Sequence, residues 1–245
     1  MTFHLITIFP VIFDSYLNDG ILRRAQAKKK VKFKIYDLRE FATADKHRTV
    51  DDTPYGGGPG MVLKVEPIYK CLEKIKDNIK QNNSKAKFKI ILTSAKGQQF
   101  SQSKAEQWKN LTDLIIICGR YEGVDERVAQ ELVDEEISVG KYVLTGGELP
   151  ALIIVDAVTR LIPEVLGNKE SLICESYNKA ENFDYPVYTK PEIFNGWKVP
   201  EILLSGNHEK INKWRKKQQG MLGTKIKRRS EEHTSELQSQ PTISY

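Results

Sequence analysis

Carboxylate and arginine side chains gather around two glycine-punctuated segments of this chain. They are residues 118–127 (Cys-Gly-Arg-Tyr-Glu-Gly-Val-Asp-Glu-Arg) and residues 139–150 (Val-Gly-Lys-Tyr-Val-Leu-Thr-Gly-Gly-Glu-Leu-Pro). A positioned carboxylate can accept or donate a proton, and an arginine can stabilise developing negative charge. The charged residues in and after these segments include Glu122, Asp125, Glu126, Arg127, Asp156, Arg160 and Glu175. Residue type alone favours surface charges or structural ion pairs for most of them.

The glycines of the two segments favour a pocket formed by backbone groups. Residues 114–117 are a continuous apolar run that ends at Cys118 and Gly119, which is typical of a buried parallel strand. Ligands of open α/β sheets bind beyond the carboxyl ends of such strands. We therefore expect a crevice where this strand ends.

A third glycine-rich stretch, residues 53–61, invites comparison with phosphate-binding loops. It lacks Lys followed by Ser or Thr after its last glycine, and it lacks the dinucleotide glycine spacing after a strand. Both absences argue against a nucleoside triphosphatase. From the sequence alone, a tight irregular loop without a binding role is about as plausible as a functional one. The charged residues just before it, His47, Arg48, Asp51 and Asp52, suit either solvent or RNA.

Histidine and cysteine usage gives no sign of a metal centre or a nucleophilic triad. His4 lies in an expected strand, so we predict that it is packed, whereas His208 could equally cap a helix, pack or bind. Cys71, Cys118 and Cys174 are odd in number and widely spaced, which favours buried thiols in a reducing compartment over a disulfide or a zinc site.

The composition is that of an ordinary globular protein. The chain has 245 residues, of which 40% are hydrophobic and 29% charged. No apolar run approaches the roughly 20 residues that a membrane-spanning helix needs. Residues 1–10 are typical of a strand and lack a basic leader or a cleavage site. We therefore expect a cytoplasmic protein without a membrane partner.

The net charge of +6 suits a polyanionic partner, and its distribution is uneven. One basic cluster covers residues 28–30, and another contains Lys210, Lys213, Arg215, Lys216, Lys217, Lys225, Lys227, Arg228 and Arg229. Asn207 is a plausible cap for a helix in which Lys210, Lys213 and Lys217 share one face, while Ile211 and Trp214 point elsewhere. This basic stripe could bind RNA or could simply be a solvated lysine-rich surface.

Hydrophobic periodicity predicts alternating strands and helices. Expected strands cover residues 2–9, 31–35, 88–93 and 111–118, and expected helices cover 11–30, 66–80, 102–109, 126–133 and 148–162. This alternation is typical of an α/β domain with a mostly parallel sheet. We place that domain at residues 1–162, a polar linker at 163–182 and a small basic helical domain at 183–229. Residues 230–245 lack periodicity, so we expect a disordered or non-native tail.

Five motifs, taken together and in order, resemble those of the bacterial tRNA (guanine-37-N1)-methyltransferases. They are His-Arg-Thr-Val-Asp-Asp at 47–52, Pro-Tyr-Gly-Gly-Gly-Pro-Gly-Met at 54–61, the segment 118–127, Thr-Gly-Gly-Glu-Leu-Pro at 145–150 and Leu-Leu-Ser-Gly-Asn-His at 203–208. The resemblance covers the chain to about Arg229. It implies a SPOUT-type fold, in which the parallel-sheet domain has a deep C-terminal trefoil knot, an exception to the rule against threaded chains.

The resemblance also implies an activity and its partners. Such enzymes transfer a methyl group from S-adenosylmethionine to N1 of guanosine 37 in tRNA, which helps to maintain the reading frame. They are homodimers with a composite active site at the interface. A requirement for Mg²⁺ is associated with the family, but no ligand cluster in this sequence assigns a metal site.

Site residues follow from the same resemblance. The cofactor would be held by Thr93, Ser94, Ala95, Gly119, Tyr121, Glu122, Val139, Gly140, Lys141, Tyr142, Val143, Leu144, Gly146, Gly147 and Pro150. Glu175 would be the general base for guanine N1, at a position where the family usually has aspartate, and Arg160 would stabilise charge on O6. The tRNA would be bound by Lys210, Lys213, Arg215 and Lys217, in a C-terminal domain shorter than the family's.

Two other functions stay open from the sequence. Glutamate at position 175 is compatible with a non-catalytic RNA-binding module that keeps the basic face. A related knotted methyltransferase could act on a ribose 2′-OH or on another base. Cofactor binding separates the first alternative from the enzyme, and the identity of the methylated nucleoside separates the second.

Overall fold

The computed structural model describes residues 1–42, 48–166 and 184–219. The chain forms two compact units, Met1–Gly167 and Asn168–Tyr245. The boundary between them falls inside the predicted linker 163–182, most of which, like the predicted tail 230–245, lies outside the described residues. The positions of the domain boundaries therefore stay predictions.

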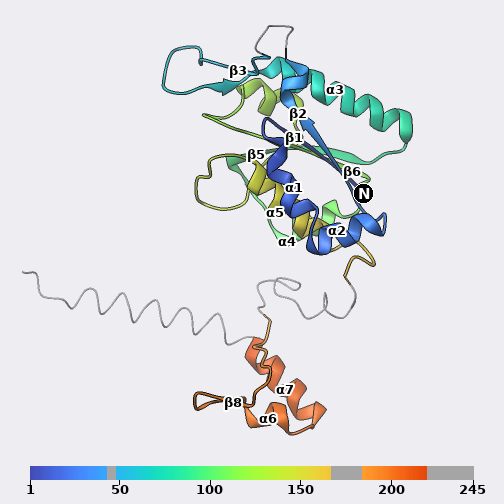
Figure 1. The fold of residues 1–245 in the computed structure, drawn as a ribbon, viewed down its shortest axis with the longest axis vertical. Coiled ribbons are helices and arrows are strands. Elements are labelled where there is room, and N and C mark those ends of the chain that lie inside the picture. The colour runs from blue at the N-terminus through green and yellow to red at the C-terminus, as the bar shows by residue number, and fades with distance from the viewer. Residues whose placement is uncertain (43–47, 167–183, 220–245) are drawn as a thin grey trace, which may run out of the picture. The chain divides into compact units, whose positions relative to one another are not determined.

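The first unit is built on a parallel sheet of five strands, as the α/β prediction required (Figure 1). The strands are β1 (Thr2–Thr7), β2 (Lys32–Asp37), β5 (Phe88–Gln99), β6 (Asp113–Cys118) and β7 (Glu135–Ser138), and their order is β2-β1-β6-β5-β7. Every strand pair in this sheet is parallel. The two central strands β1 and β6 are buried almost throughout, because both faces of the sheet are covered.

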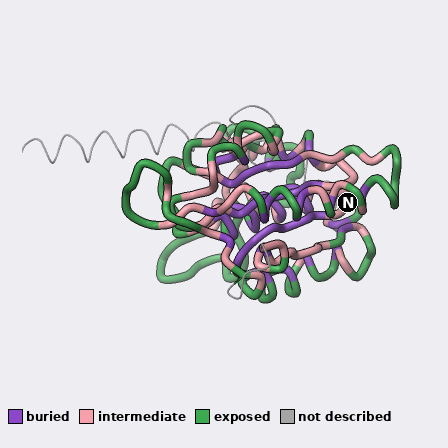
Figure 2. The backbone as a smooth tube through the Cα atoms, turned by 90° about the horizontal axis from the view of Figure 1, so that it is seen from above, coloured by how far each residue is buried: buried purple, intermediate pink, exposed green. Residues whose placement is uncertain are grey.

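Helices cover both faces of this sheet, as Figure 1 shows. The helix α3 (Val65–Asn82) packs on one face with the short helices η2 (Leu38–Phe41) and η3 (Val128–Leu132). The other face carries η1 (Pro10–Phe13), α1 (Asp14–Leu17), α2 (Gly20–Ala27), α4 (Gln102–Trp108) and α5 (Glu148–Thr159). Buried backbone, drawn purple in Figure 2, accordingly runs through the interior between exposed stretches drawn green.

Three predicted helices differ from the observed ones. The helix expected over 11–30 is interrupted at Asn18 and Asp19, because Asp19 caps a new helix by accepting a hydrogen bond from the N–H of Gly20. The helix expected over 126–133 is only the five-residue π-turn η3, and α5 ends at Thr159, short of residue 162. A side-chain cap accounts for the first difference, whereas η3 has no side-chain cap and α5 ends where the N–H of Arg160 donates to the carbonyl oxygens of Asp156 and Val158.

The strand β7 was not predicted, and β5 is longer than expected. The sequence of β7 is only Glu-Glu-Ile-Ser and it lies at the sheet edge, so it shows neither an apolar run nor clear alternation. Its pairing with β5 is irregular between Thr93 and Gln98, which takes residues 94–97 out of the regular ladder. This irregularity opens the sheet next to the predicted crevice.

After β7 the chain returns across the carboxyl ends of β5 and β6 before it enters α5. The N–H of Gly147 donates a hydrogen bond of 2.8 Å to the carbonyl oxygen of Gly119 in this return. The knot implied by the resemblance would lie here, and its threading stays a prediction.

His4 is packed, as the sequence predicted. Its ring is buried in β1, with Nδ1 3.0 Å from the Tyr36 hydroxyl and Nε2 3.0 Å from an Asp113 carboxylate oxygen. Burial lowers the pKa of His4 below its usual value, and this outweighs the opposing effect of Asp113. The ring is therefore neutral at pH 7, and its contact with Asp113 is a hydrogen bond rather than an ion pair.

Over residues 184–219, the described part of the second unit, the chain forms a β-hairpin and two helices. The hairpin pairs β8 (Ile193–Phe194) with β9 (Trp197–Lys198), and the helices are α6 (Glu201–Leu204) and α7 (His208–Gln219). Asn207 caps α7 as predicted, since its side-chain oxygen accepts a hydrogen bond of 3.0 Å from the N–H of Lys210.

Candidate functional site

A pocket of about 490 Å³ opens beside the irregular part of β5 and the ends of β6 and β7. Three segments line it: residues 92–96 within β5, residues 119–124 after β6, and residues 136–147, except Lys141, at the end of β7 and beyond it. The crevice expected from the sequence therefore exists, at the carboxyl edge of the sheet. Parallel pairing brings the three segments together, because it directs all three strand ends to one edge.

The lining contains nearly every residue that the resemblance assigns to the cofactor. These are Thr93, Ser94, Ala95, Gly119, Tyr121, Glu122, Val139, Gly140, Tyr142, Val143, Leu144, Gly146, Gly147 and Pro150. Lys141 is exposed and does not line the pocket. Further lining residues were not predicted, among them Lys96, Glu136 and Ser138. Glu136 and Ser138 were missed because β7 was missed.

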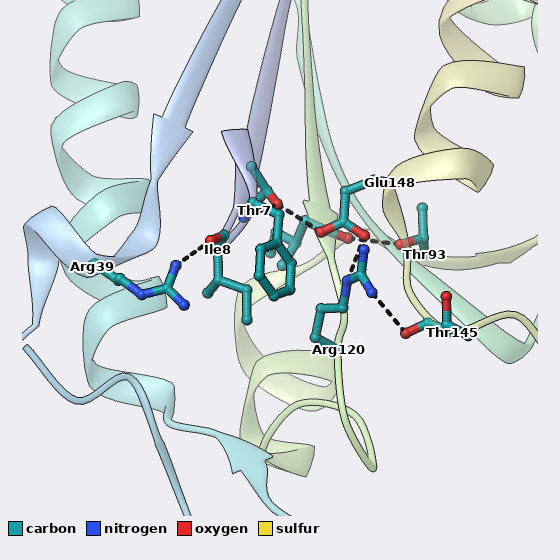
Figure 3. A network of polar contacts seen from close by, with 9 residues as sticks. Thr7, Ile8, Arg39, Thr93, Arg120, Thr145 and Glu148 are labelled. Atoms are coloured by element: carbon teal, nitrogen blue, oxygen red, sulfur yellow. Dashed lines mark hydrogen bonds and ion pairs between the residues drawn. The ribbon is translucent and has the colours of Figure 1, made fainter. Parts of the chain in front are cut away.

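A buried network joins two of the lining segments (Figure 3). Glu148, at the first position of α5, is only 1% exposed and accepts hydrogen bonds from the Thr7 hydroxyl (2.7 Å) and from Nε of Arg120 (2.8 Å). Arg120 also donates to the carbonyl oxygen of Thr145 and stacks on the ring of Phe9 at 4.7 Å. One arginine thus connects the loop after β6 to the loop before α5. We call Thr7, Arg120, Thr145 and Glu148 the loop clamp.

Close packing explains the glycines at 146 and 147, since the first lies against Arg120 of the clamp and the second against Thr93. A Cβ atom on Gly146 would lie 2.2 Å from Nε of Arg120, and one on Gly147 would lie 2.0 Å from the Thr93 hydroxyl. Both distances are far below van der Waals contact. The sequence suggested that these glycines give a ligand close access to the backbone, whereas here they make room for protein atoms.

Carboxylates dominate the charge of the pocket lining. Glu122, Glu126 and Glu136 contribute to it, against Lys96 and the clamped Arg120. Lys96 pairs with Glu126 at 2.7 Å and lies 3.8 Å from Oε1 of Glu136. Within the described part of the chain, the buried Oε2 of Glu136 has no hydrogen-bond partner. A cationic or N–H group of a ligand would satisfy that oxygen.

Other charged candidates from the sequence have structural partners. Arg127 donates to both carboxylate oxygens of Asp125 and lowers the pKa of that carboxyl. Asp156 accepts a hydrogen bond of 2.6 Å from the Tyr16 hydroxyl and raises the pKa of Tyr16. These contacts argue for ion pairs and packing at Asp125, Arg127 and Asp156.

The predicted catalytic pair is not assembled among the described residues. Glu175 lies outside them. Arg160 is the C-cap of α5, whereas the N-cap Gly147 lines the pocket. At about 1.5 Å per residue, the two ends of this helix are about 20 Å apart, which is more than an arginine side chain spans. Arg160 therefore cannot act in the pocket of its own chain while α5 keeps this position.

The glycine-rich loop 53–61 is attached to the pocket. The N–H of Glu122 donates to the carbonyl oxygen of Met61 at 3.1 Å, and a Cβ on Gly60 would meet the Glu122 side chain at 2.6 Å. The loop connects the short strands β3 (Asp51–Asp52) and β4 (Val62–Leu63). It is the irregular loop that the sequence left open, and it lies against the outer side of the 119–124 segment.

The three lysines of the basic stripe are exposed, whereas Arg215, the fourth predicted RNA-binding residue, is not part of that exposed face. Lys210, Lys213 and Lys217 on α7 are exposed, and Lys213 pairs with Glu209 at 2.7 Å. Arg215 is half-buried and lies over the ring of Tyr185 at 4.8 Å. Arg215 therefore holds α7 against the start of the described second unit instead of joining the exposed lysines.

The described residues contain two cysteines, and both are buried. Cys71 and Cys118 are buried free thiols; burial raises the pKa of Cys71 to about 12 and that of Cys118 well above its usual value, while Cys174 lies outside. In the described ranges, no three His, Cys, Asp or Glu side chains are grouped to hold a metal ion. No helix in those ranges has the length and apolar character needed to cross a membrane.

Comparison with known proteins gives one consistent result. The family described as tRNA (guanine-1)-methyltransferase TrmD matches residues 1–232. A tRNA (guanine-N(1)-)-methyltransferase of Dictyoglomus turgidum is 52% identical over 214 residues, which is 87% of this chain and 83% of the relative. The one of Clostridioides difficile is 47% identical over 218 residues, 89% of this chain and 92% of the relative. The crystal structure of a tRNA (m1G37) methyltransferase from Aquifex aeolicus has a TM-score of 0.74 and 40% identity, covering 98% of this chain and 99% of that one.

Proposed function

The chain belongs to the tRNA (guanine-1)-methyltransferase family TrmD, and from this premise we propose that it methylates N1 of guanosine 37 in tRNA. The observation that carries the proposal is the pocket at the ends of β5, β6 and β7. All the residues that the resemblance assigns to the cofactor line that pocket, except Lys141. The tRNA substrate favours the cytoplasm as the site of the reaction.

The pocket suits S-adenosylmethionine. This molecule carries a positive sulfonium and a positive amino group, and it supplies an activated methyl group when bound. The carboxylates of Glu122, Glu126 and Glu136 favour such positive charge, and the unpartnered Oε2 of Glu136 offers a buried acceptor. Tyr142 and Leu144 provide apolar wall for a purine ring.

The reaction at guanine needs two further side-chain roles. N1 carries a proton, so a base must remove it while the negative charge that develops on O6 is stabilised. We assign the base to Glu175. We assign the stabilisation of O6 to the guanidinium of Arg160. Fixing N1 in line with the methyl group would supply much of the acceleration through positioning.

The distance between Arg160 and the pocket supports an active site shared by two chains. Arg160 lies about one α5 length from the pocket of its own chain. A second copy could bring its own Arg160 to that pocket. Residues 167–183, which include Glu175, would then act on the partner's cofactor. We therefore propose a homodimer whose two sites each combine both chains.

An exposed apolar face offers a surface for the second copy. It consists of Val11, Ile12, Tyr16, Leu149 and Ile153, which are exposed on η1, α1 and α5. The hydrogen bond from Tyr16 to Asp156 joins α1 to α5 within this face. Leu149 and Ile153 lie one helical turn apart on the outer side of α5. Apolar side chains grouped in this way favour burial against another protein surface.

The test is methylation of unmodified tRNA that carries guanosine at position 37. The full chain is incubated with labelled S-adenosylmethionine, and the nucleosides are identified by mass spectrometry, with adenosine at position 37 as the control substrate. We expect N1-methylguanosine at that position only. A 2′-O-methylated or otherwise methylated product would point to a related knotted enzyme, and tRNA binding without any methylation would point to an RNA-binding module. Repeating the assay with EDTA and then with added Mg²⁺ tests the metal requirement.

A further inference from the structure

The second unit carries an aromatic pair on a short hairpin. Phe194 and Trp197 are register partners on β8 and β9, and their ring centroids are 6.0 Å apart at an interplanar angle of 54°. Asn195 and Gly196 form the connection with φ of +51° and +82°, which are the conformations of a tight two-residue hairpin turn. The N–H of Val199 donates to the carbonyl oxygen of Glu192 at 2.9 Å and continues the pairing. The two rings are thus held by backbone pairing rather than by a core.

Both rings face outward to an unusual extent for large aromatic side chains. Phe194 is 57% exposed and Trp197 is 72% exposed. Figure 1 shows the hairpin projecting away from α6 and α7. By contrast, Trp108 in the first unit is 3% exposed. Exposed aromatic area of this size favours a partner that offers a flat apolar face.

The charge around the hairpin favours a polyanion as that partner. Residues 184–219 contain seven Lys or Arg residues and four Asp or Glu residues. Lys190 precedes β8, and Lys198 pairs with Ile193 on the hairpin, on the face opposite the two rings. Exposed aromatic rings on a unit with a net positive charge are typical of proteins that bind single-stranded nucleic acid, where bases stack and phosphates are neutralised.

We propose that Phe194 and Trp197 form a platform on which unpaired bases of the RNA substrate stack. This inference rests on the proposed function, because it takes a tRNA with an unpaired loop as the substrate. Stacking is tolerant of base identity, since every base has an aromatic face. The hairpin would therefore contribute affinity for an open loop, and the pocket would select the base that reacts.

The test measures binding of a fluorescently labelled stem–loop RNA by the full chain, using anisotropy. Trp197→Ala should weaken binding about 5- to 150-fold, the loss expected for one stacked base. Trp197→Phe should restore most of the affinity, because it keeps an aromatic face. Ile193→Ala is the matched control, since it removes an exposed apolar side chain from the same hairpin and should leave binding nearly unchanged.

Two further measurements identify the cause of the loss. A fully paired duplex of equal length should be bound equally by wild type and by Trp197→Ala, because a duplex offers no unpaired base. The dependence of affinity on salt should keep its slope in Trp197→Ala, since no phosphate contact is removed.

Several results would overturn the platform. One is equal stem–loop affinity of wild type and Trp197→Ala. Another is an equal loss of affinity for stem–loop and duplex. A shift in oligomeric state of Trp197→Ala in analytical ultracentrifugation would show instead that the hairpin covers a second copy of the chain. Failure of the proposed function is recognised separately, because the wild-type chain would then fail to methylate guanosine 37, whatever the variants bind.

Discussion

Glu148→Gln tests whether the loop clamp shapes the pocket. The substitution keeps the size of the side chain and removes the charge that faces Arg120. The Thr7 hydroxyl already accepts a hydrogen bond from the N–H of Phe9 at 2.9 Å and donates to Glu148. A glutamine has only one oxygen, so its NH₂ group must face either the Thr7 hydroxyl or Nε of Arg120. If it faces Nε, two donors meet and that hydrogen bond is lost. If it faces Thr7, it can donate to the second lone pair of the hydroxyl oxygen, but the hydroxyl proton then loses its acceptor. Both orientations leave one donor of the clamp without its acceptor.

The burial of the pair sets the size of the effect. Breaking a buried ion pair by removing one partner costs about 3–5 kcal/mol in the free energy of unfolding. The side chain of Arg120 is 17% exposed and keeps its contacts with Thr145 and Phe9, which places the expected loss near the lower limit, at about 3 kcal/mol. If half of that free energy is also lost from cofactor binding, because the two lining segments are held less firmly, the dissociation constant of S-adenosylmethionine should rise about tenfold.

The assay combines urea unfolding with isothermal titration calorimetry of S-adenosylmethionine on the full chain. Glu66→Gln is the matched control, because it breaks an exposed ion pair with Lys70 on α3 and Glu66 does not line the pocket. It should change the free energy of unfolding by less than about 0.5 kcal/mol and leave cofactor binding unchanged. A loss below about 1 kcal/mol in Glu148→Gln would refute the energetic reasoning. A large loss with unchanged cofactor affinity would show that the clamp supports the fold but not the pocket.

Three further outcomes are expected. Arg160→Ala subunits keep an open pocket, and Ala95→Trp subunits, whose pocket is filled, keep Arg160. If each site combines two chains, mixing the two variants should therefore restore activity in the mixed dimer. An inactive mixture would place Arg160 and the pocket in one chain. Lys213→Glu should weaken tRNA binding and reduce its salt dependence while cofactor affinity stays the same, as filter binding at several salt concentrations can show. Because folding lowers the pKa of His4, the neutral ring contributes its full stability above pH about 6.5, and this contribution decreases as the pH falls. The difference in unfolding free energy between wild type and His4→Phe should therefore shrink at pH 5, by at most about 1.4 kcal/mol per pH unit. A difference that does not change with pH would contradict a neutral buried ring.

Much of the first unit could be predicted from local patterns. The apolar run before Cys118 became the central strand β6, and the spacing of Ile68, Leu72 and Ile75 became the buried face of α3. In the second unit, Asn207 likewise marked the start of α7. These patterns can be recognised because a helix and a strand that bury one face each repeat their apolar residues at a different spacing along the chain. The ordered motifs likewise identified the family without any tertiary information.

The weaker elements could not be read in this way. The strand β7 has four residues and owes its place to pairing with β5. The interruption of the expected helix over 11–30 depends on a cap at Asp19 that overrides an otherwise helical composition. Short segments carry too few residues for periodicity to outweigh such local and long-range contacts.

Tertiary structure alone decided how the candidate site is arranged. Thr7 and Glu148 are 141 positions apart in the sequence, yet they share a buried hydrogen bond that no motif encodes. The same folding places Arg160 one helix length from the pocket that it was expected to serve. The sequence by itself determined which residues are suited to bind and to react, because composition and spacing carry that chemistry. Only the three-dimensional packing decided which of them meet within one chain, because parallel strands and a rigid helix fix distances that spacing along the chain does not contain.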